Sequence, residues 1–357
     1  MDTSLNVVIN KILMAAAKQR ASYIHLTVGA YPSLRVDDKL VELETENVIT
    51  NDFVKKIADD WLDDVQKKIL EQEKIVTFTK EIGKKFRLKA NFFFQKKFLS
   101  ASLSLIPSQI PLLTNLGLPK SVFNLTEKKS GLVVIAGPFS SGKTTTVASI
   151  IEEINKSRKE NIFVIEKPTE YLFINKKSLV EQQEVGRDVN SFVAALEYAQ
   201  QADIDIVAVG TTSEREAIPL VLDFANSGRL AILAMDTMSV IQTIEEIFAS
   251  FPANEKQRAQ FLLAESLVAI VAQRLVPRIG GGLSLAAEVL IATEPVRSLI
   301  KEARISQITN ILQTSRAEGM LNMDQSLADL VDSGEVLVEK AVEHASDAQN
   351  FRAMAKR

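Results

Sequence analysis

Cysteine is absent from the 357 residues of this chain, and histidine occurs only as His25 and His344. Without cysteine the chain forms neither disulfides nor thiolate metal sites, and two histidines leave little for a zinc centre. Long apolar runs are missing too: no run has the length of about 20 residues that a helix needs to span a bilayer. The N-terminus, Met1-Asp2-Thr3-Ser4, lacks the basic start of a signal peptide. We therefore expect a cytosolic protein.

The chain also lacks an excess of charge of either sign. Its 42 basic and 45 acidic residues give a net charge of −3. This balance gives no case for a nucleic-acid or membrane surface, although it does not exclude local patches. A length of 357 residues, with 46% hydrophobic and 24% charged, is typical of a globular protein with two domains.

The most informative stretch is a glycine-rich loop between two apolar segments, Gly137-Pro138-Phe139-Ser140-Ser141-Gly142-Lys143-Thr144. It follows the apolar run 132–136 and precedes residues 145–155, whose apolar side chains recur at helical spacing. Strand, turn and helix are the context that the pattern G-x-x-x-x-G-K-[ST] requires. The pattern alone arises by chance in roughly one chain in a hundred of this size. The pattern together with its flanking strand and helix predicts that the protein binds a nucleoside triphosphate.

Each residue type in this loop suits phosphate chemistry. Glycines let the backbone curl until successive N–H groups point inward, and the helix N-terminus adds its dipole. Lys143 is expected to reach the β- and γ-phosphates, and Thr144 to offer its hydroxyl to Mg²⁺. The expected cofactors are thus ATP and Mg²⁺. The residues expected to hold them are Gly137, Ser140, Ser141, Gly142, Lys143, Thr144 and Thr145.

The first part of the chain, residues 1–106, predicts a small α+β domain with mostly antiparallel strands. His25 lies on a short predicted strand, where we interpret it as a structural hydrogen-bonding residue. The helices are expected at 5–18 and from 54 to 69, the second with Asn51-Asp52 as its N-cap. Strands are expected at 23–29, 33–36, 40–43, 86–94 and 99–106.

The second part, residues 127–357, follows a predicted linker at 107–126 that contains prolines, a glycine and polar residues. Apolar strands at 132–136, 162–165, 206–210 and 230–234 alternate there with helices. This alternation predicts an α/β domain with a mainly parallel sheet. Ligands bind such sheets beyond the carboxyl ends of the strands. The loop at 137–144, Glu166, Gly210 and Asp236 all fall there.

Several further motifs carry a resemblance to a known family. They are Ile165-Glu166-Lys167-Pro168-Thr169-Glu170, Gln183-Glu184-Val185-Gly186-Arg187-Asp188, Phe251-Pro252, Leu263-Ala264-Glu265-Ser266-Leu267, Ala272-Gln273-Arg274-Leu275, Pro295-Val296-Arg297-Ser298-Leu299-Ile300 and the run from Gly319 to Leu327. Over nearly its whole length the chain resembles type IV pilus retraction ATPases, the PilT-type twitching-motility proteins of the secretion ATPase superfamily. The Arg297 motif resembles one tied in that family to pilus retraction.

The resemblance implies a PAS-like N-terminal domain before a RecA-like ATPase domain. It also implies a hexameric ring with nucleotide between subunits, formed by this chain alone or mixed with an active paralogue. In the family, ATP hydrolysis drives pilin subunits out of the fibre through an inner-membrane platform protein. The implied localisation is cytoplasmic, either free or at the cytoplasmic face of the inner membrane. By this resemblance Arg87 is a candidate to reach a neighbouring subunit's nucleotide, as N-domain arginines do in the family, with Lys96 and Lys97 as weaker substitutes. The alternative for all three is a solvated surface charge.

Departures from the family pattern bear on catalysis. The Walker B signature has Thr211 in place of a glutamate and Ser213 in place of an arginine, and the histidine box has Asp236 in place of histidine. Lys167 replaces an aspartate of the acidic box, either facing solvent or substituting for a lost cation. Thr211 cannot act as an anionic group that orients water. Loss of one positioned electrostatic group costs on the order of a hundred- to a thousand-fold in rate.

Two readings of the function follow. The first is an active retraction ATPase in which Glu166 or Glu214 serves as the catalytic carboxylate. The second is a nucleotide-binding protein with slow or absent hydrolysis that acts as a structural or regulatory partner of an active paralogue. Thr211, Ser213 and Asp236 favour slow or absent hydrolysis. A general P-loop protein of assembly or secretion is a third reading, and the Arg297 motif weakens it.

Overall fold

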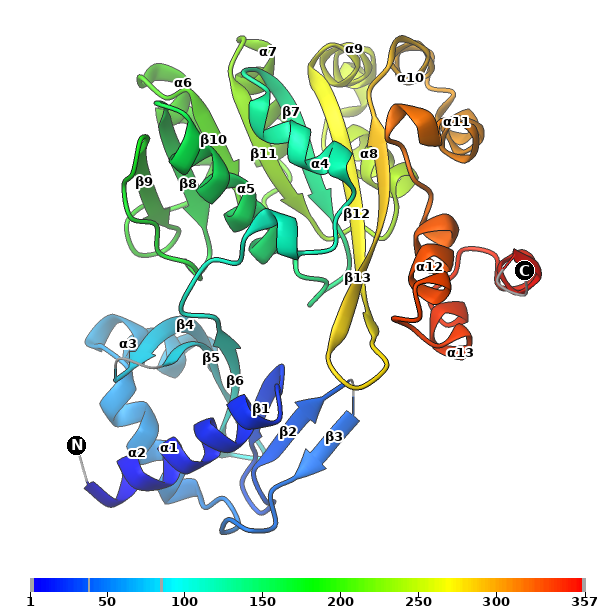
Figure 1. The fold of residues 1–357 in the computed structure, drawn as a ribbon. Helices are drawn as coiled ribbons and strands as arrows, with labels where there is room; N and C mark the ends of the chain where they lie inside the picture. Colours follow the sequence, from blue (N-terminus) through cyan, green and yellow to red (C-terminus); the bar gives the residue numbers. More distant parts are fainter. Residues whose placement is uncertain (1–2, 38, 84–85, 355–357) are drawn as a thin grey trace. The chain divides into compact units, whose positions relative to one another are not determined.

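The computed structural model describes residues 3–37, 39–83 and 86–354 (Figure 1). The chain divides into two compact units, residues 1–109 with 280–282 and residues 110–279 with 283–357. Most of the segment predicted as a linker packs within the second unit, because Leu113, Val122 and Leu125 are buried in its core. No helix in the described part of the chain is both long and apolar enough to cross a membrane.

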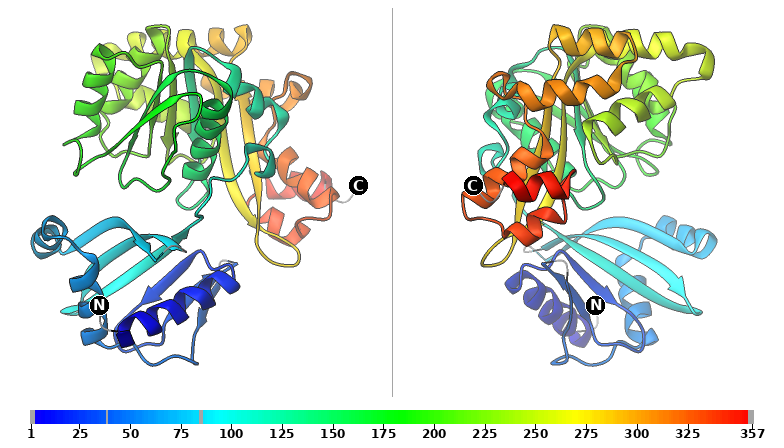
Figure 2. Two further views of the ribbon diagram at one scale, coloured as in Figure 1. Left: turned by 60° about the vertical axis from the view of Figure 1, so that its left-hand side comes forward. Right: turned by 90° about the vertical axis from the view of Figure 1, so that its right-hand side faces the viewer.

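The first unit contains a six-stranded sheet in the order β3-β2-β1-β6-β5-β4, and all of its neighbouring strands are antiparallel. This confirms the predicted α+β class. The apolar residues of α1 and α2 pack with the inward-facing strand residues in one core, and Figure 2 shows α1 lying along the sheet. The strands are β1 (Tyr23–Leu26), β2 (Ser33–Val36), β3 (Lys39–Glu42), β4 (Ile75–Ile82), β5 (Phe86–Gln95) and β6 (Phe98–Ile106), and the helices are α1 (Thr3–Lys18), α2 (Asn51–Trp61) and α3 (Asp64–Glu73).

The single helix predicted from 54 to 69 is wrong, because a capping box divides it. The side chain of Asp63 accepts a hydrogen bond from the Gln66 N–H at 2.8 Å, and the Gln66 side chain accepts from the Asp63 N–H at 3.1 Å. This reciprocal pair satisfies backbone donors that a helix start leaves without partners. A new helix, α3, therefore starts after Asp63 rather than continuing α2.

The predicted N-cap of α2 is wrong as well. The helix begins at Asn51, and Thr50 is its N-cap: the Thr50 hydroxyl accepts from the Phe53 N–H at 3.1 Å. His25, predicted to form a structural hydrogen bond, has a buried Nε2 with no hydrogen-bond partner among the described residues. Burial and the nearby Arg35 lower the pKa of His25, which favours the neutral ring.

The second unit contains a seven-stranded sheet in the order β13-β12-β7-β11-β10-β8-β9. From β12 to β9 the neighbouring strands are parallel, and β12–β13 is an antiparallel hairpin. The predicted mainly parallel sheet is therefore confirmed, although β9, β12 and β13 were not predicted. The strands are β7 (Gly131–Ala136), β8 (Asn161–Glu166), β9 (Leu179–Glu184), β10 (Ile206–Val209), β11 (Leu230–Met235), β12 (Leu267–Pro277) and β13 (Leu283–Ile291).

Helices cover both faces of this sheet (Figure 1). Alternate residues of β7 enter two different cores: Leu132 and Val134 join one, and Val133 and Ile135 join the other. Burial on both faces explains why the strands read as continuous apolar runs. The helices of this unit are α4 (Lys120–Phe123), α5 (Lys143–Ser157), α6 (Phe192–Gln201), α7 (Ala217–Asn226), α8 (Val240–Ala249), α9 (Lys256–Ser266), α10 (Glu294–Lys301), α11 (Ile308–Thr314), α12 (Met323–Asp332), α13 (Val338–Val342) and α14 (Ala348–Met354), with short 3-10 turns at Leu113–Asn115, Asn124–Glu127, Ala253–Glu255, Ile305–Gln307 and Arg316–Glu318.

The C-terminal helices pack against the β12–β13 hairpin (Figure 2). Val276 and Ala286 of the hairpin share a core with Met323, Leu327 and Phe351 of α12 and α14. The sequence of residues 341–357 carries no functional motif, and Ala341 and Phe351 of this segment are buried in that core.

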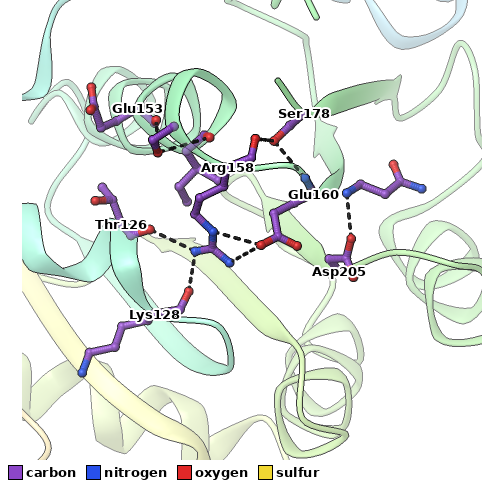
Figure 3. A network of polar contacts seen from close by, with 10 residues as sticks. Thr126, Lys128, Glu153, Arg158, Glu160, Ser178 and Asp205 are labelled. Carbon is purple, nitrogen blue, oxygen red and sulfur yellow. Dashed lines mark hydrogen bonds and ion pairs between the residues drawn. The ribbon is translucent and has the colours of Figure 1, made fainter. Parts of the chain in front are cut away.

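Hydrogen bonds around Arg158 join the start of β7 to the end of α5, the strand and helix that flank the glycine-rich loop (Figure 3). Arg158, the C-cap of α5, donates to the carbonyls of Thr126 at 2.9 Å and Lys128 at 2.6 Å, just before β7. It also pairs with Glu160 at 2.8 Å, and Ser178 donates to the Arg158 carbonyl at 2.8 Å. The start of β7 and the end of α5 are thus held together.

Glu288 on β13 connects the beginnings of two helices. Its Oε1 accepts from the N–H of Val240, the first residue of α8, at 2.7 Å, and the N–H of Met323, the first residue of α12, also donates to it. Burial raises the pKa of Glu288 above its ordinary 4.5. The two N–H groups and the nearby Arg274 act in the opposite direction, but burial is the larger cause.

This raised pKa makes stability depend on pH. Above pH 4.5 the unfolded chain releases the Glu288 proton while the folded protein still holds it, so stability falls as the pH rises toward the folded pKa. Glu288→Gln removes this dependence. We expect the melting temperature of the wild type, relative to that of Glu288→Gln, to decrease between pH 5 and pH 8. The exposed Glu245 on α8 provides the control Glu245→Gln, and an equal pH trend in both variants would contradict the assignment.

Candidate nucleotide-binding site

The predicted site residues lie at one edge of the second sheet. Strands β7, β11, β10 and β8 are consecutive neighbours and run parallel, so their carboxyl ends meet. The residues that follow them are Gly137, Asp236 and Gly210, and Glu166 ends β8. The structure thus brings together side chains that the sequence places up to about a hundred residues apart, as expected at the ligand-binding edge of a parallel sheet.

The backbone of the glycine-rich loop leaves no room for a side chain at Gly137. A Cβ on Gly137 would lie 2.3 Å from the Ser141 Oγ and 2.5 Å from the Gln273 carbonyl oxygen, so only glycine fits. Ser140 and Gly142 adopt positive φ angles of 62° and 88°. Gly142 is the N-cap of α5 and brings no side-chain acceptor to the first turn of that helix. The helix N-terminus is therefore suited to an anion.

Two hydroxyl groups of the loop also fit phosphate and metal. The Ser141 Oγ is buried and has no hydrogen-bond partner among the described residues, whereas buried polar groups are normally satisfied. Thr144 is half-buried at the start of α5. No group of three or more His, Cys, Asp or Glu residues suited to a metal occurs in the described part of the chain. The Thr144 hydroxyl at the start of α5 is an oxygen that would suit a Mg²⁺ ion bound with the nucleotide.

Lys143 is buried, with 7% of its side chain exposed, and its ammonium group is fully engaged. It donates to the carbonyls of Gly137 at 2.9 Å and Pro138 at 2.8 Å. Its third contact is an ion pair with the Asp236 Oδ1 at 2.8 Å. The sequence indicated that Asp236 brings negative charge to this edge. It did not predict that the charge would be paired with the lysine of the loop.

Gln273 supports the loop from the neighbouring strand β12, a role that no sequence motif indicates. It lies on β12, is completely buried, and bridges two parts of the site. Its Nε2 donates to the Ser141 carbonyl at 2.8 Å, and its Oε1 accepts from the Thr146 hydroxyl at 3.0 Å. One amide thus fixes both the loop and the first turn of α5. The available signal was a polar residue directly after the apolar run 267–272.

Glu166 is the better placed of the two candidate catalytic carboxylates. It ends β8, is 9% exposed, and lies so close to Gly210 that a Cβ there would be 3.4 Å from the Glu166 Cγ. The residue after Gly210 is Thr211, which has no carboxylate. Glu214 instead accepts from the Val193 N–H at 3.2 Å, in the first turn of α6. Glu214 lies in the loop after β10, and this hydrogen bond directs one of its carboxylate oxygens to α6.

Thr145 and Arg87 are engaged in contacts within the described chain. The Thr145 hydroxyl lies 3.1 Å from the Tyr171 hydroxyl, and burial raises the pKa of Tyr171, so that phenol is neutral near pH 7. Arg87, on β5 of the first unit, donates to Glu81 at 3.2 Å and Thr79 at 3.1 Å. Lys167 is exposed, in agreement with the interpretation that it faces solvent.

Arg297 on α10 joins this helix to the end of α9. Its guanidinium donates to the carbonyls of Ala264, Glu265 at 2.9 Å and Leu267 at 2.8 Å. The last carbonyls of a helix lack partners within it, and a basic side chain satisfies them. Arg297 therefore has a structural role: it holds the start of α10 against the end of α9.

The sequence profile of the family described as Type II/IV secretion system protein matches residues 1–283. The chain belongs to this family. A type IV pilus retractation ATPase PilT from Pseudomonas aeruginosa is 34% identical over 343 residues, which cover 96% of this chain and 99% of that protein. A twitching motility protein from Neisseria gonorrhoeae is 34% identical over 339 residues, covering 93% of this chain and 90% of that protein. The predicted resemblance is confirmed.

Solved structures agree with this membership. The crystal structure of the pilus retraction motor PilT with bound ADP has a TM-score of 0.82 at 35% identity, covering 96% of this chain and 98% of that one. The ATPase DotB from Legionella pneumophila has a TM-score of 0.81 at 21% identity, covering 94% of each chain, which shows a shared fold. The predicted fold class, an ATPase domain preceded by a smaller α+β domain, is thereby confirmed.

Proposed function

We propose that this protein is an ATP-binding motor protein of the type IV pilus system, of the kind that acts in pilus retraction and twitching motility, with slow or absent ATP hydrolysis. The names of its relatives and the ADP in the PilT crystal structure support the first part. The second part rests on residues of this chain: an intact phosphate-binding loop lies beside Thr211 and the Lys143–Asp236 pair.

The site has more groups suited to binding the phosphates than groups suited to catalysing their hydrolysis. Lys143, the helix N-terminus at Gly142 and the loop backbone would bind and orient the phosphates, and Thr144 would hold Mg²⁺, which would supply neutralising positive charge. Glu166 is left to orient the attacking water. Thr211 adds no anionic group beside it, and Asp236 withdraws part of the positive charge of Lys143 from the phosphates. Binding is thus retained while the electrostatic stabilisation of the transition state is reduced.

The ring and its partners are part of the same proposal. We expect a homo-hexamer or a mixed ring with an active paralogue, contacting an inner-membrane platform protein of the pilus at the cytoplasmic face. Arg87 is the proposed cation that reaches the neighbouring subunit's nucleotide, and it must exchange its contacts with Glu81 and Thr79 to do so. The alternative function is that of a non-catalytic structural or regulatory partner in such a ring, which Thr211, Ser213 and Asp236 favour.

Equilibrium binding of Mg·ATP to the full chain tests whether the loop is the nucleotide site. We expect Lys143→Ala to weaken binding by about tenfold to a hundredfold, because a charge-assisted hydrogen bond contributes about 1.5–3 kcal/mol. The control is Lys156→Ala, which removes a lysine from the far end of the same helix, where it pairs with Glu152 at 3.6 Å. Equal affinities of the wild type and Lys143→Ala would refute the proposed site.

A further inference from the structure

The pair between Lys143 and Asp236 is positioned by the fold rather than by chance contact of two flexible side chains. Asp236 directly follows β11, and the last residue of that strand, Met235, accepts the N–H of Gly137 at 3.2 Å. The start of the glycine-rich loop and the residue before Asp236 are therefore joined by a backbone hydrogen bond. This places the Asp236 carboxylate 2.8 Å from the Lys143 ammonium.

All three N–H donors of the Lys143 ammonium group are engaged. Lysine carries three N–H donors, and Lys143 directs them to the carbonyls of Gly137 and Pro138 and to Asp236. The Lys143 side chain is 7% exposed, whereas that of Asp236 is 61% exposed. Asp236 is thus the solvent-exposed partner of the pair, and Lys143 is the buried one.

The two nucleotides make different demands on this group. The lysine of such a loop contacts the β- and γ-phosphates of a triphosphate, so ATP requires two of the three donors and ADP requires one. With ADP, Lys143 can exchange one carbonyl contact and keep Asp236. With ATP, it can release both carbonyl contacts and keep Asp236, but the γ-phosphate and the carboxylate then share one ammonium, where their like charges repel.

We propose that Asp236 determines nucleotide selectivity in this site by competing with the γ-phosphate for Lys143, so that the protein binds ADP in preference to ATP. This inference rests on the proposed function, because it assumes that nucleotide binds at the glycine-rich loop. It assigns Asp236 a role that differs from poor catalysis: the residue acts on binding, before any hydrolysis, and favours the diphosphate state of the site.

Dissociation constants for ATP and ADP, measured on the full chain by equilibrium titration with Mg²⁺ and with EDTA, test the proposal. We expect the wild type to bind ADP at least about fivefold more tightly than ATP, and Asp236→Asn to shift this ratio toward ATP by about tenfold. The shift should be larger in EDTA, because Mg²⁺ offsets part of the phosphate charge. Asp236→Asn is expected to fold normally, since its side chain is mostly exposed.

The matched control is Asp223→Asn, which removes another ion-paired aspartate, bonded to Arg258 at 2.8 Å. Asp223 lies in the C-terminal half of α7, which leads into the start of β11, so it is near the opposite edge of the sheet. The control should leave the ATP to ADP ratio within twofold of the wild type.

Three outcomes oppose the inference and can be told apart. A ratio in Asp236→Asn within twofold of the wild type overturns it while leaving the proposed site intact. Weaker Mg·ATP binding in Asp236→Asn, with no change in EDTA, overturns it in favour of Asp236 as a magnesium ligand. Binding that Lys143→Ala does not affect, or no binding to any variant, refutes the proposed site and the inference with it.

Discussion

Replacing Thr211 by glutamate together with Asp236 by histidine is expected to raise steady-state phosphate release by about a hundredfold or more. Thr211 follows Gly210, which packs against Glu166, so a glutamate at 211 places a second carboxylate near the residue left to orient water. Removing Asp236 frees the Lys143 ammonium from its ion pair. Phosphate release by the purified wild type, each single variant and the double variant measures the effect.

The single variants separate the two causes. Because groups that act as one catalytic unit do not contribute additively, we expect Thr211→Glu and Asp236→His each to give less than a tenth of the gain of the double variant. A correctly folded double variant without any gain would place the defect elsewhere, for example in the cations supplied by a neighbouring subunit.

Replacing Gln273 by alanine is expected to destabilise the second unit and to weaken nucleotide binding by about tenfold or more. The substitution removes both hydrogen bonds of a completely buried amide. It leaves the Ser141 carbonyl and the Thr146 hydroxyl without that partner, and each unsatisfied buried group costs about 1–3 kcal/mol. Because these groups belong to the loop and to the first turn of α5, the phosphate site loses its shape together with its stability.

Melting temperature and ATP affinity are the two measurements for this variant. The control is Gln200→Ala on α6, whose amide makes one longer contact of 3.4 Å, to the Leu220 carbonyl. Gln273→Glu keeps the acceptor for Thr146 but places a buried carboxylate oxygen against the Ser141 carbonyl, so we expect it to weaken affinity at least as much as Gln273→Ala does. A Gln273→Ala protein with unchanged affinity would show that the loop holds its conformation without β12.

The local part of the site was predictable from the sequence, and the long-range part was not. The glycines and Lys143 of the loop are contiguous in sequence, and the strand and helix around them have clear periodicity, so their role follows from local chemistry. The Gln273–Ser141 bond joins residues 132 positions apart, and the Lys143–Asp236 pair depends on β11 lying beside β7. Hydrophobic periodicity predicts strands but not their order in the sheet.

The errors in the fold have equally specific causes. The helix predicted from 54 to 69 follows a continuous apolar stripe, but the capping box at Asp63 and Gln66 is a local signal that outweighs it. The position of Glu214 depends on the course of the loop after β10, where it contacts the Val193 N–H. Spacing along the sequence from Thr211 contains no information about that course.

The most direct test of the central claim is a single-turnover experiment with the full chain in excess over Mg·ATP, at concentrations where the nucleotide is bound. The account predicts that bound nucleotide is recovered as ATP, with conversion to ADP slower than about one per second, the lower range of ordinary enzymes. Conversion at or above that rate that requires Lys143, or failure of the chain to retain nucleotide at any concentration, would contradict it.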